Sequence, residues 1–277
     1  MNYLEFNFEI TPFKPWSEIV AAYLSDIDFD GFHYENKILK AFVSEDLFMA
    51  NKFEEIISTV RDSNVSISFT RNNIPQQNWN ELWESNFNPV SVTDELLIVA
   101  PFHKKNERFK WNIVIEPKMS FGTGHHQTTH LMCEAILNLD LNNKTILDMG
   151  SGTGLLAILA EKKGSKNITA IDIEQWSTES CIENCKYNKC QYIQSLCGGI
   201  DLLDGKKFDI IFANINKNIL KAQMKTYFKS LNENGFLYLS GFFSSDADEL
   251  ISYSEKGGLH FKSKNTRDEW AILTLQK

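Results

Sequence analysis

The sequence predicts an α/β protein in which a small α+β domain precedes an open sheet. The first observation comes from residues 144–172, where an apolar strand, a glycine-rich turn, a helix and a second strand ending in an acid follow one another. The second comes from residues 4–69, where strands and helices alternate in an order typical of a separate small sheet. With 277 residues, 43% hydrophobic and 23% charged, the chain is long and apolar enough for two globular domains.

Six consecutive segments near the N-terminus carry apolar residues at the period of a strand or of a helix. They predict strands at 4–10, 31–34, 38–43 and 65–69, and helices at 15–27 and 47–61. The order β-α-β-β-α-β is the ferredoxin-like arrangement, which we assign to a first domain at residues 1–72. This region has no cluster of histidines, cysteines or paired acids, so we expect it to bind a partner. A purely structural role is the alternative.

The segment after this domain, residues 71–77, is polar and contains proline, which predicts a boundary. We expect a linker at residues 73–95 with a short helix over residues 78–87. Aromatic residues recur at every fourth position of that helix and therefore share one face. That face is expected to pack on the second domain or, alternatively, to line part of a substrate cleft.

The second domain, residues 96–277, continues as alternating strands and helices. Strands are predicted at 96–100, 111–115, 144–147, 168–172, 207–213, 236–240, 259–263 and 270–275, and helices from His125 onward and at 155–163, 177–188, 219–231 and 246–253. We expect the last two strands to pair antiparallel, Trp270 to anchor the core, and the turn Asn234-Gly235 to end the preceding helix. Asn214 follows a strand of this series, at the edge where open α/β sheets bind ligands.

The spacing of the glycines distinguishes two classes of nucleotide site. Residues 148–154 read D-M-G-S-G-T-G, whereas a dinucleotide fingerprint is G-x-G-x-x-G, with a pyrophosphate at the helix N-terminus. Asp148 would repel a pyrophosphate and suits a ligand that carries an amine. The pattern resembles motif I of S-adenosylmethionine methyltransferases, and Asp172 resembles their ribose-binding acid. A dehydrogenase and a tight structural turn are the alternatives.

Two groups of residues resemble metal ligands without matching a metal motif. His126 and His130 are spaced as in H-E-x-x-H, but Gln127 cannot serve as the general base of such a site. The cysteines at positions 181–197 have the spacing C-x3-C-x4-C-x6-C, unlike the C-x2-C pairs of zinc sites. We therefore expect no metal. The histidines are expected to belong to a hydrogen-bonded loop near the ligand, and the cysteines to be free thiols that pack within the fold.

The net charge and composition limit the classes of partner and the location expected for this protein. The net charge of −8 disfavours an enzyme that grips long stretches of RNA, and it favours a basic protein or a small molecule. No run of 18 apolar residues is present, so no transmembrane helix is expected. The first five residues lack a basic region followed by an apolar one, so we expect no signal peptide and a cytoplasmic protein.

Four motifs occur together and in order: Asn78-x-x-x-Leu82-Trp83, the block from Phe121 to Thr129 that begins F-G-T-G-H-H, the loop from Asp148 to Leu156, and Ala213-Asn214-Ile215. In combination they resemble the PrmA family of ribosomal protein L-eleven methyltransferases. The resemblance extends from about residue 78 to the end by motif, and over the first 75 residues by predicted topology only. It implies a ferredoxin-like domain that recognises the ribosomal protein, a linker, and a class I methyltransferase domain with a Rossmann-like sheet of seven strands.

The resemblance also implies the site residues, carried over by matched motif. The expected contacts of S-adenosylmethionine are Thr123, Gly150, Asp172 and Asn214, and the residues expected to shape the loop are Asp148, Gly152 and Gly154. Asn214 and Asn216 are the expected catalytic residues, because their side-chain oxygens are hypothesised to orient an amine. In many family members the residues after Asn214 are small or apolar, whereas here they read Ile-Asn-Lys-Asn.

The implied reaction is methylation of lysine side chains or an N-terminal α-amine of ribosomal protein L-eleven. A closed cleft lowers the pKa of an amine by desolvation, so a strong base is unnecessary. The chain lacks the N-P-P-Y motif that grips planar base amines. An enzyme of the same fold acting on RNA or a small-molecule amine is the alternative, as is a non-catalytic nucleotide-binding module. We expect a monomer with no sequence-specific nucleic-acid binding and no membrane association.

Overall fold

The computed structural model describes residues 2–63, 65–74, 87–117 and 122–277. The chain divides into two compact units, Met1–Asn86 and Phe87–Lys277, and each is described by itself. The helix expected over residues 78–87 falls, apart from Phe87, outside the described residues. In the described parts of the chain, no helix is both long and apolar enough to cross a membrane.

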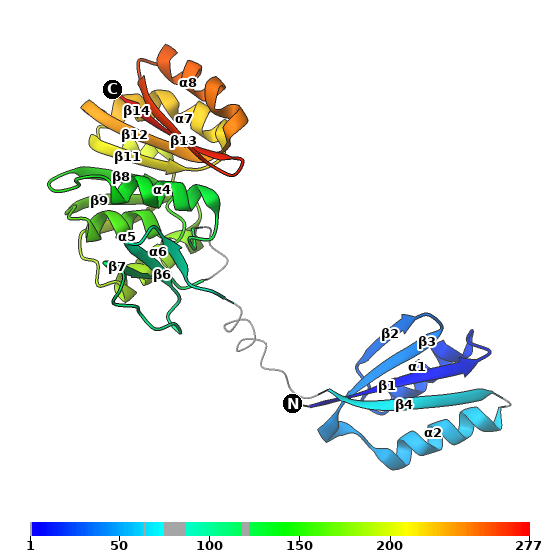
Figure 1. The fold of residues 1–277 in the computed structure, drawn as a ribbon. Helices are drawn as coiled ribbons and strands as arrows, with labels where there is room; N and C mark the ends of the chain where they lie inside the picture. The colour runs from blue at the N-terminus through cyan, green and yellow to red at the C-terminus, as the bar shows by residue number, and fades with distance from the viewer. Residues whose placement is uncertain (1, 64, 75–86, 118–121) are drawn as a thin grey trace. The chain divides into compact units, whose positions relative to one another are not determined.

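The first unit is an antiparallel sheet with two helices on one face (Figure 1). Its elements are β1 (Tyr3–Thr11), α1 (Trp16–Ser25), β2 (Gly31–Glu35), β3 (Ile38–Ser44), α2 (Ala50–Asp62) and β4 (Ser66–Ile74), and the sheet order is β2-β3-β1-β4. Alternate residues of β1 from Leu4 to Ile10 are buried, so the period of two in the sequence does form the core face. The β-α-β-β-α-β order predicted from the sequence is confirmed.

Phenylalanine rings fill the core of this unit. The ring of Phe53 from α2 lies 4.7 Å from that of Phe6 and 5.0 Å from that of Phe69, measured between centroids. Both distances are in the range at which tilted or edge-on aromatic pairs stabilise a core. The rings therefore fasten α2 to the central strand and to the last strand of the sheet.

Two predicted boundaries in the first unit are wrong. Residues 71–74 do not begin a linker, because they continue β4 and pair with Tyr3–Phe6 of β1. Their polar side chains are compatible with an exposed strand, since β4 lies at the edge of the sheet. The second helix begins at Ala50 rather than at Leu47, because a 3-10 turn at Glu45–Leu47 precedes it.

The second unit is built on a seven-stranded sheet of order β10-β9-β8-β11-β12-β14-β13. Its strands are β8 (Thr145–Met149), β9 (Asn167–Asp172), β10 (Ile193–Cys197), β11 (Phe208–Asn214), β12 (Leu231–Phe243), β13 (His260–Arg267) and β14 (Trp270–Gln276). Strands β8 to β12 are parallel, and β14 pairs antiparallel with both β12 and β13, as predicted. A separate three-stranded sheet of β5 (Val90–Val92), β6 (Leu96–Val99) and β7 (Trp111–Val114) precedes it.

Helices cover both faces of the large sheet (Figure 1). One face packs against α4 (Gln127–Leu137), α5 (Leu155–Lys162) and α6 (Gln175–Tyr187), and the other against α7 (Lys217–Ser230) and α8 (Ala247–Lys256). Successive residues of β8 alternate between the two faces, with Ile146 in the first core and Leu147 in the second. Strands β8, β9 and β11 are buried on both sides, which is why they read as continuous apolar runs.

Three features of this unit differ from the sequence prediction. Strands β5 and β10 are not predicted, because both are short and carry little apolar periodicity. Helix α7 ends at Ser230, and the Asn234-Gly235 turn that was expected to end it lies inside β12. There Asn234 has a φ of 63°, and the backbone pairing with β11 shifts register between Phe208 and Ile210.

Candidate active site

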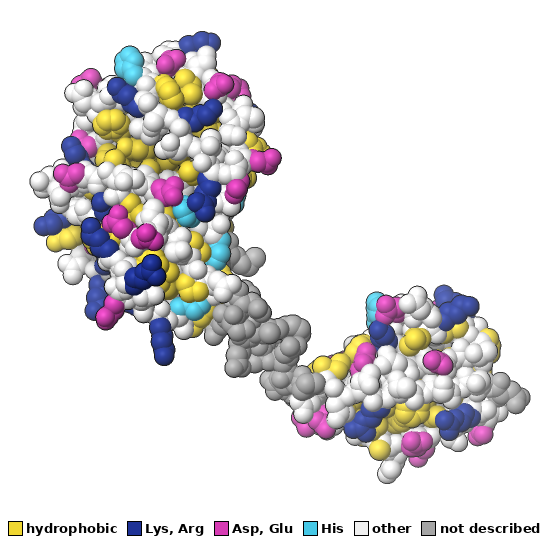
Figure 2. Space-filling model, viewed as in Figure 1, with side chains coloured by type: hydrophobic (Ala, Val, Ile, Leu, Met, Phe, Trp, Pro, Cys, Tyr) yellow, Lys and Arg dark blue, Asp and Glu magenta, His cyan; other side chains and the backbone are white. Residues whose placement is uncertain are grey.

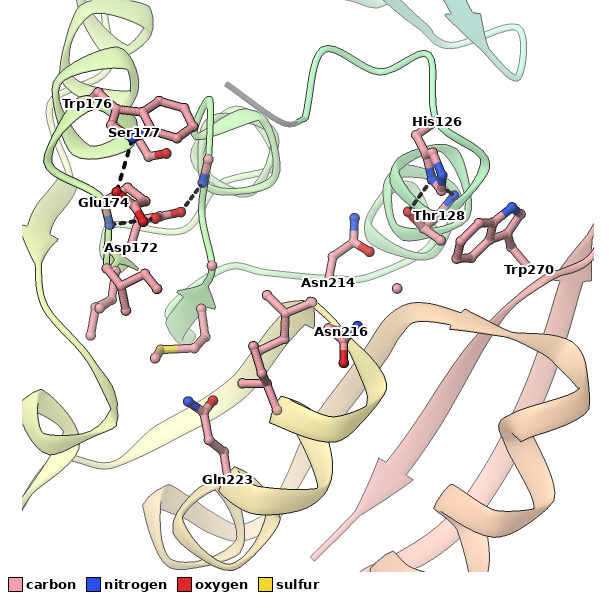
Figure 3. A pocket seen from close by; sticks show the side chains of 18 residues that line it. His126, Thr128, Asp172, Glu174, Trp176, Ser177, Asn214, Asn216, Gln223 and Trp270 are labelled. Carbon is pink, nitrogen blue, oxygen red and sulfur yellow. Dashed lines mark hydrogen bonds between the residues drawn. The ribbon is translucent and has the colours of Figure 1, made fainter. Parts of the chain in front are cut away.

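A cavity of about 580 Å³ opens at the carboxyl edge of the large sheet (Figure 3). Its walls come from the loops after β8, β9 and β11, from α7, from β12, and from the starts of α4 and β14. Its polar and aromatic lining residues are His126, Thr128, Asp172, Glu174, Trp176, Ser177, Asn214, Asn216, Gln223 and Trp270. This is the position at which open α/β sheets bind ligands.

Two glycines let the loop after β11 cross the cavity floor. Gly150 has a φ of 73°, and a Cβ on it would lie 2.2 Å from Cγ2 of Ile215. Gly241 of β12 has a φ of 94°, and a Cβ there would lie 2.4 Å from the Ile215 carbonyl oxygen. Ile215 is therefore held between two positions that only glycine can occupy, with backbone on either side of it.

Hydrogen bonds fix the carboxylate of Asp172 at one end of the cavity (Figure 3). Oδ2 accepts a bond from the Gly152 amide at 2.9 Å, and Oδ1 accepts one from the Glu174 amide at 3.0 Å. Next to it, the indole N–H of Trp176 donates to Oε2 of Glu174 at 3.1 Å. Each carboxylate oxygen of Asp172 keeps a second lone pair, so the group can still accept hydroxyl donors from a ligand.

Asn214 projects into the middle of the cavity from the end of β11 (Figure 3). Its Nδ2 lies 3.5 Å from Oγ1 of Thr129, at the limit of a hydrogen bond. Its Oδ1 is buried and has no hydrogen-bond partner among the described residues. A buried amide oxygen without a donor costs stability, and no hydrogen bond of this oxygen is lost if the side chain turns it toward an N–H group of a ligand.

Asn216 lines the cavity in a different way. It is the N-cap of α7, and its Oδ1 accepts a bond from the amide of Asn218 at 2.9 Å. That bond satisfies one of the free amides at the start of the helix. The side chain of Asn216 therefore fixes where α7 begins, directly after the loop that carries Asn214.

Histidine and tryptophan side chains form the opposite end of the cavity. His126 caps α4, and its Nδ1 accepts the amide of Thr128 at 3.3 Å and lies 2.8 Å from the Thr128 hydroxyl. Burial lowers the pKa of His126, so the ring is neutral at pH 7. The rings of His126 and Trp270 are 4.6 Å apart, and Trp270 also stacks on Phe243 at 4.4 Å. Trp270 packs against the core, as the sequence predicts, and it also lines the cavity.

The structure brings five of the predicted site residues together around the cavity: Gly150, Gly152, Asp172, Asn214 and Asn216. Thr123, Asp148 and Gly154 do not line it. Thr123 lies in the loop before α4, where its Oγ1 is 3.2 Å from Nδ1 of His125. Gly154 is the N-cap of α5 in the left-handed conformation, and a Cβ on it would lie 2.5 Å from the sulfur of Cys181.

Asp148 lies beneath the glycine loop and is completely buried. The alternation of β8 places it on the same face as Ile146, under α5, where its Oδ2 accepts the amide of Ala157 at 3.1 Å. Its Oδ1 has no partner among the described residues. Burial raises the pKa of Asp148 to about 7. The carboxyl group therefore acts on the loop through the start of α5.

The histidines and cysteines with spacings similar to metal ligands contact different partners. His126 faces Trp270, while Nδ1 of His130 lies 3.5 Å from a carboxylate oxygen of Glu134. Cys181 is buried, and Cys185 and Cys190 are partly buried and pack against the core of the α4, α5 and α6 face. Within the described ranges, no three His, Cys, Asp or Glu side chains are grouped closely enough to hold a metal ion.

Several lining residues escaped the sequence analysis. Glu174 and Trp176 follow Asp172 at the second and fourth positions, and this proximity was an available signal. Gly241 and Gln223 had no local signal, because their role depends on the crossing of β12 and α7 near the loop after β11. His126 and Thr128 belong to the segment that the sequence predicts as a hydrogen-bonded loop near the ligand, although neither is predicted as a site residue.

Comparisons with known proteins agree over nearly the whole chain. The family model described as ribosomal protein L11 methyltransferase (PrmA) matches residues 22–277. A Porphyromonas gingivalis protein named ribosomal protein L11 methyltransferase is 36% identical over 281 residues, which cover 99% of this chain and 97% of that protein. A Bacteroides fragilis protein of the same name is 35% identical and covers 99% of each chain. The crystal structure of a ribosomal protein L11 methylase from Lactobacillus delbrueckii subsp. bulgaricus has a TM-score of 0.63 and 27% identity, over 68% of this chain and 98% of that one.

Proposed function

Because this chain belongs to the ribosomal protein L11 methyltransferase (PrmA) family, we propose that it transfers methyl groups from S-adenosylmethionine to amino groups of ribosomal protein L11. The acceptors are lysine side chains and the N-terminal α-amine. One observation carries the proposal: the carboxylate of Asp172 lines one end of a single cavity, and its middle is lined by Asn214, whose oxygen has no hydrogen-bond partner among the described residues. The first suits a ribose and the second an amine.

The residues present fit S-adenosylmethionine. Gly150 and Gly152 offer close backbone approach, since neither has a side chain in the way, and the carboxylate of Asp172 is already oriented by two amides. Asp148 and Gly154 shape the loop from beneath. Thr123 joins this set through its place in the neighbouring loop. The cofactor supplies a methyl group on a sulfonium, which is electrophilic without further activation.

The acceptor amine must be neutral to attack. With an ordinary pKa of about 10.4, a lysine at pH 7 pays about 5 kcal/mol to lose its proton. Moving the amine from water into a cavity with apolar walls reduces this cost, because desolvation penalises the charged form. The oxygen of Asn214 then accepts an N–H bond from the amine and leaves the nitrogen lone pair free to point along the methyl–sulfur axis. Asn216 supports this geometry as the cap of α7.

No lining carboxylate is placed to act as the base. Of the described residues that line the cavity, Asp172 and Glu174 carry the only carboxylates, and both lie on the far side of the site from His126 and Trp270 (Figure 3). The neutral His126 uses its Nδ1 to accept the Thr128 amide. Proton loss to solvent during entry of the amine is therefore the route that the site supports.

The distribution of charge favours a basic protein as the partner. The first compact unit, residues 1–86, holds 14 Asp and Glu against 6 Lys and Arg, whereas residues 87–277 hold 22 of each. The whole net charge of −8 thus belongs to the first unit. On the face drawn in Figure 2, acidic and basic side chains are interspersed over the second unit, without the large basic surface that RNA binding requires.

We assign substrate recognition to the ferredoxin-like domain, whose last strand β4 ends at Ile74, and methyl transfer to the unit that begins at Phe87. An acidic module attracts a basic ribosomal protein over a distance of about one Debye length, roughly 8 Å at physiological salt. The enzyme acts as a cytoplasmic monomer. Methylation of RNA or of a small amine is the second candidate, and the charge of the first unit weighs against RNA.

The test is the intact mass of purified ribosomal protein L11 after incubation with this enzyme and S-adenosylmethionine. Mass increases in whole methyl steps are expected, and peptide fragmentation is expected to place them on lysines or on the α-amine. Ribosomal RNA fragments and free lysine serve as competing acceptors. Cofactor binding by calorimetry without any mass change on L11 would leave the cofactor site standing and remove L11 as the substrate.

A further inference from the structure

Two buried side chains outside the cavity connect the loops that surround it. Asn184 of α6 has no exposed surface. Its Oδ1 accepts the amide of Glu116 at 2.9 Å, and its Nδ2 donates to the carbonyl of Thr153 at 2.9 Å. The side-chain amide of Asn184 therefore connects the segment after β7 to the glycine loop.

Thr153 extends this connection to the loop before α4. It is also fully buried, and its Oγ1 donates to the carbonyl of Gly122 at 2.7 Å. Gly122 has a φ of 103°, and a Cβ on it would lie 2.9 Å from that same hydroxyl oxygen. The two loops are thus in direct contact at a point that tolerates only glycine. Thr123 follows Gly122 immediately in the chain.

A second asparagine, one helical turn further along α6, fixes the same incoming segment. Oδ1 of Asn188 accepts the amide of Val114 at 2.9 Å, and its Nδ2 donates to the Val114 carbonyl at 2.6 Å. The end of β7 is therefore attached to α6 before the chain reaches Gly122. Among the described residues, Asn184 and Thr153 connect the segment after β7, the loop at Gly122 and the glycine loop by hydrogen bonds.

We propose that Asn184 and Thr153 are positioning residues that hold the loop at Gly122–Thr123 against the glycine loop and thereby set the affinity for the cofactor. Neither residue lines the cavity, so each acts through the backbone next to residues that do: Thr153 follows Gly152, and the loop at Gly122 leads to His126. The proposal rests on the proposed function only for the identity of the ligand. A buried donor or acceptor that loses its partner is costly, so both loops shift when either bond is removed.

The test measures binding of S-adenosylhomocysteine to the full chain by calorimetry. Thr153→Val keeps the shape of the side chain and removes the donor, and it is expected to weaken binding about tenfold, equivalent to about 1.4 kcal/mol. Thr153→Ser keeps the hydroxyl and is expected to bind within about twofold of the wild type. Asn184→Asp keeps the acceptor but sets a carboxylate oxygen against the Thr153 carbonyl, so it is expected to weaken binding by at least as much as Thr153→Val.

Thr169→Val is the control, because it removes a hydroxyl from a buried residue of β9 that does not line the cavity. Steady-state kinetics supply a second readout. The KM for S-adenosylmethionine is expected to rise in Thr153→Val and Asn184→Asp, while kcat at saturating cofactor stays within about threefold, because neither residue reaches the reacting atoms.

Three results would overturn the proposal. They are binding by Thr153→Val within about twofold of the wild type, equal weakening by Thr153→Ser and Thr153→Val, and a fall in kcat with an unchanged KM. Melting curves of each variant show whether the fold is retained. If Asn184→Asp does not fold, the comparison of Thr153→Ser with Thr153→Val still tests the proposal. A wild-type chain that fails to bind S-adenosylhomocysteine would instead reject the cofactor site itself.

Discussion

In the wild-type protein, Asp148 is expected to lower the free energy of unfolding as the pH rises. Replacement of Asp148 by asparagine is expected to abolish this effect. The carboxyl group is completely buried under α5, with one hydrogen bond from Ala157 and an oxygen that has no partner among the described residues. Burial raises its pKa to about 7, from an ordinary value of about 3.9 for aspartate. Asparagine keeps an acceptor for the Ala157 amide and never carries a charge.

The direction follows from which state binds the proton. Between pH 4 and pH 7 the folded protein holds the Asp148 proton and the unfolded chain has lost it, so the free energy of unfolding falls as the pH rises. From the two pKa values, the loss due to this group is about 1.5 kcal/mol at pH 5 and about 4 kcal/mol at pH 8. Relative to the wild type, Asp148→Asn should therefore gain about 2.5 kcal/mol between pH 5 and pH 8.

Urea unfolding of the two proteins at pH 5, 6, 7 and 8 measures this difference, with equal slopes against urea as the condition for comparing them. Asp201→Asn, which changes an exposed carboxyl group of the same unit, is the control and should show no such trend. A stability difference between Asp148→Asn and the wild type that is constant to within about 0.5 kcal/mol over this range would refute the argument.

Three further predictions concern binding and turnover. Asp172→Asn should weaken binding of S-adenosylhomocysteine about 10- to 100-fold, because it removes the charge that strengthens a hydrogen bond to ribose; calorimetry measures this, and unchanged affinity would contradict the assignment. Asn214→Ala should lower kcat for methylation of L11 by about 100-fold or more, and full turnover would remove its role in orienting the amine. Reversing Glu54 and Glu55 to lysine on the exposed side of α2 should raise the KM for L11 and flatten its dependence on salt, with kcat unchanged; a KM that still rises as steeply with salt as that of the wild type would count against electrostatic recruitment.

Local patterns in the sequence predict most of the elements, though not β5 and β10, and one end of the site. The strand before Asp148, the glycine loop, α5 and the strand ending at Asp172 are adjacent in the chain, so their order alone predicts that Asp172 faces the loop. The period of two in β1 likewise predicts its buried face. The predicted end of β4 is wrong because the strand continues through polar residues. Pairing at the sheet edge, rather than apolar periodicity, stabilises those residues.

Tertiary structure decided everything that depends on segments meeting across the sheet. Trp270 is the first residue of β14, far in the sequence from the other lining residues. It lines the cavity because β14 pairs with β12 and brings the ring against His126. Gly241 matters only because the loop after β11 crosses it, and the connection of Asn184 to Thr153 exists only once α6 has packed beside α5. A sequence pattern specifies which face a residue occupies, whereas the distance between faces of different elements is set by the packing of the whole domain.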